Sequence, residues 1–338
     1  MKLLVTGGAG FIGCHFVRHM LQRGDCAVRV LDALTYAGSL ENLADVAEHP
    51  AYEFIQGNVC DCETVVRATE GVEAVVHFAA ESHVDRSIHG PSGAVYTNVM
   101  GTLQVLEAAR DAEVERVVII STDEVYGEAR GAAMTEASPL NPRNPYAAAK
   151  TGADRLGYAY FVTYGLPAII HRATNNYGPY QFPEKLVPLF VYRALRDQPL
   201  PVYGDGLQVR DWLQVSDNCR AIELLLTAGE PGEAYNVPGG NERPNLEVIR
   251  LLLDELGKPE SLIAYVADRP GHDVRYALDG AKIATLGWQP QVEWEPGMRA
   301  TVRWFAEHPE WLERSVQRGA AFLGQWYARR AWSQEDVT

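Results

Sequence analysis

The chain has 338 residues, of which 47% are hydrophobic, and a formal net charge of −14 at pH 7. This composition is ordinary for a globular protein of one domain with an added lobe, or of two domains. The acidic balance argues against nucleic acid as a partner, because phosphate binding requires a basic face. Five cysteines without zinc-type spacing predict reduced thiols and no metal site. An N-terminus that enters a strand at once, and apolar runs too short to span a membrane, predict a cytoplasmic protein with no membrane partner.

Short apolar runs alternate with amphipathic stretches through the first half of the chain. The apolar runs predict strands at 3–6, 27–31, 53–56, 74–78, 117–121 and 168–171. The amphipathic stretches predict helices, the longest at 95–112 and 145–164. Strand and helix alternation of this kind is typical of a doubly wound parallel α/β sheet.

The sequence pattern of the chain changes after about residue 173. Five prolines between residues 179 and 201 separate short segments, which predicts a second, smaller lobe with mixed α/β structure. A helix at 217–228 and a strand at 234–237 predict that the chain then returns to the first domain. We therefore expect a first domain at 1–172, completed by roughly 208–237, and a lobe formed by 173–207 and 238–338. The tail after about residue 314 is expected to end in a helix with a frayed terminus.

A glycine-rich turn joins the first predicted strand to the following helix, and it consists of Gly7, Gly8, Ala9, Gly10, Phe11, Ile12 and Gly13. Glycines permit a tight turn and bring the backbone close to a pyrophosphate, while the N-terminus of the helix favours an anion. Asp32 ends the next strand, where a carboxylate can bind the ribose hydroxyls of adenosine and would repel a 2′-phosphate. The turn and the acid together predict a dinucleotide-binding domain with NAD, rather than NADP, as the cofactor.

Tyr146 and Lys150 lie four residues apart on a predicted helix and therefore face the same way. A free phenol titrates near pH 10, and a neighbouring ammonium together with the positive nicotinamide ring is expected to lower the pKa of Tyr146. Tyr146 would then accept the proton of a substrate hydroxyl while hydride leaves for NAD. An exposed helix face that carries an incidental Tyr and Lys is the alternative interpretation.

Thr122, Asp123 and Glu124 follow the predicted strand at 117–121, at the carboxyl end where open α/β sheets bind their ligands. Different environments can push neighbouring carboxylates to different pKa values, so that one serves as acid and the other as base. Eliminating water from a sugar requires both functions. A polar turn with solvated carboxylates is the alternative interpretation.

These motifs and several further segments closely resemble the extended short-chain dehydrogenase/reductase family, and within it the dTDP-glucose 4,6-dehydratases. The further segments are 77–87, 122–127, 175–180, 182–186, 210–212 and 268–273. The resemblance runs from Met1 to about Trp304. It implies a Rossmann domain with a smaller lobe that binds a nucleotide-sugar. It also implies a homodimer that pairs the helices predicted at 95–112 and 145–164.

The resemblance implies an internal redox cycle. Tyr146, assisted by Thr122 and Lys150, would deprotonate the C4 hydroxyl of the sugar as hydride leaves for NAD. Glu124 would then remove the C5 proton and Asp123 would protonate the departing C6 hydroxyl. Hydride would return to C6 as C5 is reprotonated, which leaves a nucleoside diphosphate 4-keto-6-deoxy-hexose. Because the cofactor ends as it began, NAD is expected to stay tightly bound.

By the same resemblance, two groups of residues surround the ligands. Those expected at NAD are Gly7, Gly10, Phe11, Ile12, Gly13, Asp32, Ala33, Leu34, Thr35, Asn58, Val59, Phe78, Ala79, Ala80, Thr97, Tyr146, Lys150 and Asn176. Those expected at the nucleotide-sugar are Ser82, Thr122, Asn175, Lys185, Leu186, Pro201, Val202, Tyr203, Arg210, Asn245, Arg269 and His272. Asn58 stands where the family usually has an acid, so we expect an altered adenine contact rather than lost binding.

Three other functions are considered for this sequence. A UDP-glucuronate decarboxylase on the same scaffold would need no acid for a C6 hydroxyl, and relatives with that activity resemble Thr-Ser-Glu where this chain has Thr-Asp-Glu. A 4-epimerase has no use for the pair formed by Asp123 and Glu124. A non-catalytic NAD-binding sensor would typically have lost Tyr146 or Lys150. The choice between a thymine and a uracil nucleotide stays open at the level of sequence.

Overall fold

The computed structural model describes residues 1–328 of the chain. A seven-stranded sheet forms the larger part, with strand order β10-β6-β5-β4-β1-β2-β3, and every neighbouring pair is parallel. Its strands are β1 (Lys2–Thr6), β2 (Ala27–Asp32), β3 (Tyr52–Gln56), β4 (Ala74–His77), β5 (Arg116–Thr122), β6 (Ala168–Ala173) and β10 (Ala234–Val237). This is the doubly wound Rossmann arrangement, and the predicted fold class is confirmed.

Helices cover both faces of this sheet, as the apolar character of its strands requires. The helices are α1 (Phe11–Arg23), α2 (Cys62–Thr69), α3 (Val84–His89), α4 (Pro91–Val95), α5 (Thr102–Asp111), α6 (Pro145–Tyr164) and α8 (Val215–Ala228). Neighbouring residues of a strand point to opposite faces. Leu3 and Val5 therefore pack with residues of α1 and α8, whereas Leu4 packs with residues of α2 and α5.

The helix predicted at 95–112 differs from the observed structure in its first third. A π-helical segment, Tyr96–Gly101, separates α4 from α5. The side chain of Asn98 in this segment accepts from the backbone N–H of Glu81 at 2.8 Å and donates to its carbonyl at 3.0 Å. Such wide turns are rare and are frequently found at functional sites. Here the wide turn brings Thr97 to the wall of the pocket described below.

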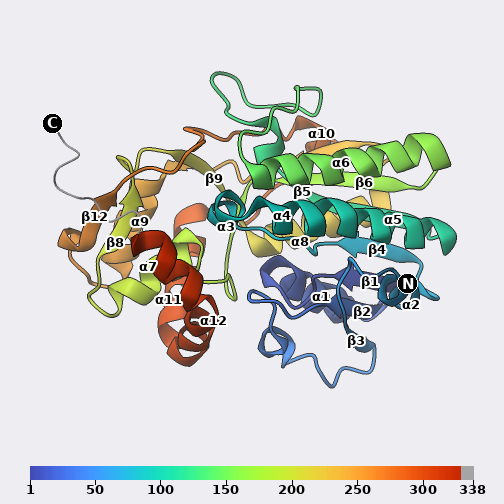
Figure 1. Cartoon of the computed structure of the whole chain (residues 1–338), viewed down its shortest axis with the longest axis horizontal. Coiled ribbons are helices and arrows are strands. Elements are labelled where there is room, and N and C mark those ends of the chain that lie inside the picture. Colours follow the sequence, from blue (N-terminus) through green and yellow to red (C-terminus); the bar gives the residue numbers. More distant parts are fainter. Residues whose placement is uncertain (329–338) are drawn as a thin grey trace.

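The smaller lobe lies beside the carboxyl ends of the large sheet (Figure 1). It contains a three-stranded sheet of β7 (Asn175–Tyr177), β9 (Val209–Gln214) and β11 (Glu242–Pro244), and a two-stranded sheet of β8 (Leu200–Tyr203) and β12 (Ile263–Val266). Its helices are α7 (Leu186–Ala194), α9 (Asn245–Glu255), α11 (Trp294–Glu307) and α12 (Pro309–Ala328). Buried residues of α7, α9 and α11, among them Phe190, Leu252 and Phe305, form its core.

The segments that return to the large sheet differ in detail from the predicted ranges. β9 belongs to the small three-stranded sheet, whereas α8 packs on the large sheet and β10 extends its edge. The short helix α10 (Ala281–Ala284) and Trp288 pack beside β10, although they follow residue 237. The division into two domains therefore stays a prediction. The predicted helical tail is present as α12, and its expected frayed end lies outside the described residues.

Candidate active site

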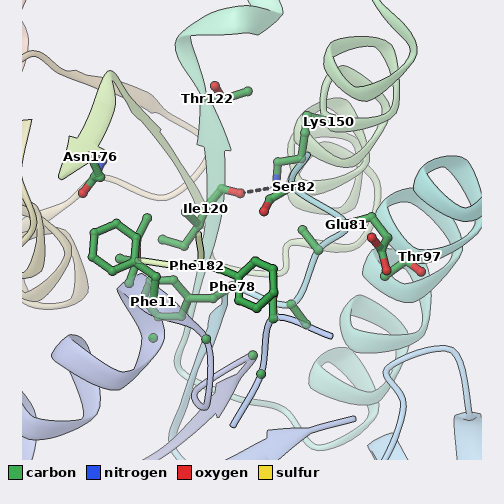
Figure 2. A pocket seen from close by; sticks show the side chains of 18 of the residues that line it. Phe11, Phe78, Glu81, Ser82, Thr97, Ile120, Thr122, Lys150, Asn176 and Phe182 are labelled. Atoms are coloured by element: carbon green, nitrogen blue, oxygen red, sulfur yellow. Dashed lines mark hydrogen bonds between the residues drawn. The ribbon is translucent and has the colours of Figure 1, made fainter. Parts of the chain in front are cut away.

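One pocket collects most of the predicted site residues at the carboxyl ends of β1, β2, β4, β5 and β6. The predicted residues on its wall are Gly7, Gly10, Phe11, Ile12, Gly13, Asp32, Ala33, Thr35, Asn58, Val59, Phe78, Ala79, Ala80, Ser82, Thr97, Thr122, Asp123, Glu124, Tyr146, Lys150, Asn175, Asn176 and Lys185. Figure 2 shows Thr122 at the end of β5, Lys150 on the neighbouring helix, and the rings of Phe11, Phe78 and Phe182 together nearby. The sequence motifs thus converge on a single pocket.

The other predicted residues lie outside this wall, and their roles stay predictions. Leu34 directs its backbone N–H to Asp32 instead, at 2.8 Å. Val202 is buried in the core of the smaller lobe, and Leu186 is packed against that core. The remaining predicted residues on the smaller lobe are Pro201, Tyr203, Arg210, Asn245, Arg269 and His272.

The glycine turn leaves room for a ligand because side chains would not fit there. A Cβ atom on Gly7 would lie 2.6 Å from the backbone nitrogen of Ala79, and one on Gly13 would collide with the carbonyl oxygen of Gly7. Gly7 also has a φ of 72°, which favours glycine. The first N–H groups of α1 follow Gly10, which carries no side chain to cap them. This arrangement suits the pyrophosphate of a dinucleotide.

The Asp32 carboxylate is fixed at the end of β2 by backbone donors. Its oxygens accept from the N–H of Ala9 at 2.9 Å and of Leu34 at 2.8 Å. A Cβ atom on Gly38 would lie 2.7 Å from Asp32 Oδ1, so glycine keeps the space beside the carboxylate open. A carboxylate that is fixed in this way beside an open space suits the ribose hydroxyls of an adenine dinucleotide. Nearby, Asn58 Oδ1 accepts from the N–H of Cys60 at 2.9 Å, which uses part of its capacity toward adenine.

Tyr146 and Lys150 lie on one face of α6 and are both buried. Lys150 Nζ donates to the carbonyl oxygen of Ile120 at 2.5 Å, the interaction dashed in Figure 2. Burial lowers the pKa of Lys150 to about 8, and the nearby Asp154 opposes this shift. The helix thus brings Lys150 to the end of β5, with an ammonium group that loses its proton more readily than that of an exposed lysine.

The expected lowering of the Tyr146 pKa is not found in the chain by itself. Burial raises the pKa of Tyr146, the negative charge of the Glu124 carboxylate raises it further, and the Thr122 hydroxyl opposes both effects. Burial disfavours the phenolate, because a charge loses its hydration there. The ammonium of Lys150 is directed to the Ile120 carbonyl. Further positive charge, such as that of the nicotinamide ring, is needed to form the phenolate.

Asp123 is the most strongly perturbed carboxyl of this group. Its side chain is buried, and burial followed by the charge of Glu124 raises its pKa to about 8. Oδ1 accepts from the Thr122 hydroxyl at 3.0 Å, whereas Oδ2 has no hydrogen-bond partner among the described residues. Asp123 is therefore protonated at neutral pH and has one oxygen uncommitted at the pocket. This is the condition of a general acid.

Glu124 is the second carboxylate and is only partly buried. Its Oε2 accepts from the side-chain amide of Asn144 at 3.0 Å and lies 3.4 Å from the Tyr276 hydroxyl. Asp123 is thus buried and Glu124 is partly exposed. Of two neighbouring carboxyl groups in such different environments, one can act as an acid and the other as a base.

Sequence reasoning missed several residues of this pocket. Glu81, Gln181, Phe182, Glu184 and Asn218 line it. Glu81, Phe182 and Glu184 lie in the segments 77–87 and 182–186 that carry the resemblance, but they were not named as site residues. Asn144, which binds Glu124 from outside this wall, had a local signal, because an Asn directly before a Pro is a typical start of a helix. The others are brought in by tertiary structure.

Several residues expected at the nucleotide-sugar already have hydrogen-bond partners within the chain. Arg269 donates to Asp85 at 3.1 Å, and the Tyr203 hydroxyl donates to the other oxygen of Asp85 at 2.8 Å. His272 Nδ1 lies 2.6 Å from Asp268. Trp326 of α12 donates to the Tyr203 hydroxyl at 2.7 Å. The network preorganises these groups, and α12 forms part of it.

Comparison with known proteins agrees with this geometry. Residues 4–301 match the family model described as GDP-mannose 4,6 dehydratase. The chain is 50% identical to the low-salt glycan biosynthesis protein Agl12 of Haloferax volcanii, over 90% of this chain and 98% of the relative. It is 49% identical to a dTDP-glucose 4,6-dehydratase of Neisseria meningitidis, over 92% and 95% of the two chains.

A solved structure gives the same result. The crystal structure of DesIV, a dTDP-glucose 4,6-dehydratase from Streptomyces venezuelae solved with NAD and a second ligand bound, superposes with a TM-score of 0.92 at 52% identity. The match covers 93% of this chain and 100% of DesIV. The family match ends at residue 301, so α12 lies beyond it. The chain therefore belongs to the GDP-mannose 4,6 dehydratase family, within the extended short-chain dehydrogenases/reductases.

Proposed function

We propose that the chain binds NAD and converts dTDP-glucose into the corresponding 4-keto-6-deoxy-hexose nucleotide by removing water across C5 and C6. The observation that carries this proposal is Asp123, a buried carboxyl whose pKa is raised to about 8 and whose Oδ2 has no partner among the described residues. A dehydratase requires such a group, because the C6 hydroxyl leaves only when it is protonated. The dTDP-glucose 4,6-dehydratases among the relatives support the choice of substrate.

The chain supplies the proton transfers of the reaction. Tyr146 takes the proton of the C4 hydroxyl, assisted by Thr122 and Lys150. Glu124 removes the C5 proton, which the C4 ketone has made acidic, and Asp123 gives its proton to the C6 hydroxyl. Bound NAD would supply the hydride acceptor for C4 and, once reduced, the hydride donor for C6, and a proton must return to C5 as hydride reaches C6. Gly7, Gly10, Gly13 and Asp32 would hold the cofactor, which we expect to remain bound through the whole cycle.

Asp123 also separates this reaction from the alternatives on the same scaffold. A UDP-glucuronate decarboxylase loses carbon dioxide from C5 and an epimerase only inverts C4, so neither needs an acid at C6. A non-catalytic NAD-binding protein would have no use for burying Tyr146, Lys150 and Asp123 together, because burial of ionisable groups is costly. The dehydratase is the one of these functions that uses every member of the cluster.

The test is to incubate the purified protein separately with dTDP-glucose, UDP-glucose and UDP-glucuronate and to weigh the products by mass spectrometry. Loss of one water from dTDP-glucose is the expected result, and the preferred glucose nucleotide defines the base specificity. Loss of carbon dioxide from UDP-glucuronate alone would refute the proposal in favour of the decarboxylase. An unchanged mass with all three would refute the enzymatic function itself.

We also propose that the protein acts as a homodimer. Large apolar side chains are exposed on the helices that were predicted to pair, namely Val95, Tyr96 and Met100 near α4 and Tyr158, Val162 and Tyr164 on α6. α4 and α6 are in contact, so these side chains belong to neighbouring surfaces. Exposed apolar groups gathered in this way are typical of a protein interface. Light scattering on the purified protein tests this, and a monomer mass would contradict it.

The cysteines support a proposal for the compartment in which the protein works. All five cysteines are free thiols, and three of them, Cys14, Cys26 and Cys219, are buried. Free thiols are typical of a reducing compartment. No helix in residues 1–328 combines the length and apolar character needed to cross a membrane. We propose that the protein works in the cytoplasm, which localisation of a tagged chain would test.

A further inference from the structure

Asn144 stands at the start of α6, the helix that carries Tyr146 and Lys150. Its Oδ1 accepts from the backbone N–H of Ala147 at 2.8 Å, and Pro145 occupies the first helical position. Together they form a helix N-terminus of high stability, since the cap binds a free N–H and the proline lacks one. The next N–H, that of Tyr146, is bound at 3.1 Å by the Ser87 hydroxyl of α3. The first turn of this helix is therefore fixed by Asn144 and Ser87.

The other end of the same amide contacts Glu124. Asn144 Nδ2 donates to Glu124 Oε2 at 3.0 Å. The orientation of the amide is determined by the cap, because only the oxygen can accept from the N–H of Ala147. The nitrogen must then face the carboxylate. Asn144 is 7% exposed, so water competes little for this hydrogen bond.

Tyr276 is the other donor near Glu124, and it is engaged elsewhere. A phenol has one proton, and the Tyr276 hydroxyl lies 2.7 Å from Asp273 Oδ2 but 3.4 Å from Glu124. Arg143 holds Asp273 in place at 2.7 Å. The proton of Tyr276 therefore belongs mainly to Asp273. Asn144 is left as the closer donor to Glu124.

We propose that Asn144 is a positioning residue that joins the two halves of the reaction. One end of its amide fixes the helix of Tyr146, which serves the oxidation at C4, and the other end orients Glu124, which serves proton removal at C5. This inference rests on the proposed function, because it takes Glu124 as the base at C5. It predicts that the two steps can be separated by substitutions at this one position.

Two substitutions make the matched comparison. Asn144→Ser keeps a side-chain oxygen that caps α6 but has no amide to hold Glu124. Asn144→Ala removes the cap as well. With Asn144→Ser, we expect C4 oxidation to stay within about threefold of the wild-type rate, while loss of water slows by roughly ten- to hundredfold, because a hydrogen bond to a charged group is lost. With Asn144→Ala, both steps should slow.

The experiment follows both steps in one turnover, with the full-length protein and dTDP-glucose in deuterium oxide. Absorbance of the bound NADH reports C4 oxidation, and mass spectrometry of the quenched sugar reports deuterium at C5 and loss of water. Thermal unfolding of each variant checks its fold. Accumulation of NADH with slow deuterium uptake in Asn144→Ser would support the proposal. Equal slowing of both steps would show a purely structural role and overturn it, as would unchanged rates.

Measurements on the wild-type protein distinguish a failure of this inference from a failure of the proposed function. If the wild type forms NADH from dTDP-glucose and loses water, any failure of the predicted separation counts against Asn144 alone. If the wild type does neither, the proposed function fails, and the role of Asn144 fails with it.

Discussion

Replacing Asp123 with Asn should separate acid catalysis from every other property of the site. The amide has nearly the same shape and can still accept from the Thr122 hydroxyl through its oxygen. It cannot give a proton to the C6 hydroxyl. We expect the substrate to be oxidised at C4 and the reaction to stop before water is lost.

The size of the effect follows from the raised pKa of Asp123. With a pKa of about 8, roughly ten molecules carry the proton for each that has lost it at pH 7, whereas an ordinary Asp is protonated in about one of a thousand. A positioned acid typically contributes about a hundred- to ten-thousandfold. Asp123→Asn should therefore slow loss of water by a factor in that range.

Stopped-flow absorbance of NADH and mass spectrometry of the product measure the two steps. In Asp123→Asn, NADH should form at a near-normal rate and then persist. In the wild type, loss of water should be constant below about pH 8 and fall above it, because Asp123 then loses its proton. The variant should lack this fall. Unchanged turnover in the variant, or loss of C4 oxidation together with dehydration, would refute the assignment of Asp123 as the acid.

The same substitution has a consequence for stability with a defined sign. The folded pKa of Asp123 is raised above its value in the unfolded chain, so the unfolded state loses this proton first as pH rises. Asp123 therefore destabilises the fold progressively between about pH 4 and pH 8, by as much as about 4 kcal/mol at pH 7. Asp123→Asn should be more stable than the wild type at pH 7 and similar to it at pH 4. If Asp123→Asn and the wild type had the same unfolding free energy at pH 7 as well as at pH 4, the raised pKa of Asp123 would be contradicted.

Three further substitutions test other parts of the site. Tyr146→Phe should leave bound NAD oxidised when substrate is added, because the C4 hydroxyl keeps its proton, and near-normal NADH formation would exclude Tyr146 as the base. Asp32→Asn should weaken retention of NAD about tenfold in a binding titration, since a hydrogen bond to a charged group is lost; unchanged affinity would count against its place at the ribose. Trp326→Phe removes the donor to the Tyr203 hydroxyl, and should raise KM for the nucleotide-sugar severalfold with little change in kcat, whereas a fall in kcat alone would contradict a binding role for α12.

The large sheet and its pocket could be predicted from sequence because their signals are local. Each strand at 3–6 or 117–121 is a continuous apolar run, and each is followed by a motif at its carboxyl end. Parallel strands bring all these ends to one edge, so the motifs meet without further information. Gly7, Gly10, Phe11, Ile12 and Gly13 of the turn therefore share the pocket wall with Asp32, Tyr146 and Lys150, and their roles there stay predictions.

The smaller lobe and the hydrogen-bond network could not be predicted in the same way. β7 and β11 have three residues each, which is too short for a periodic pattern. The π-helical segment at Tyr96–Gly101 accompanies a hydrogen bond between the side chain of Asn98 and the backbone of Glu81, a contact set by tertiary structure. The sequence predicts a lowered pKa for Tyr146, whereas burial raises it. Sequence spacing shows the neighbouring Lys150, but it shows neither where the ammonium is directed nor how deeply the phenol is buried.

Burial is the factor that organises the chemistry of this site. It raises the pKa values of Tyr146 and Asp123 and lowers that of Lys150, so all three are shifted toward their uncharged forms. An uncharged Asp123 is ready to act as an acid, whereas an uncharged Tyr146 is not yet ready to act as a base. Only the arrival of positive charge in the pocket would favour the phenolate. The chain alone is thus prepared to protonate the C6 hydroxyl, whereas removal of the C4 hydroxyl proton by Tyr146 requires positive charge such as that of a bound nicotinamide ring.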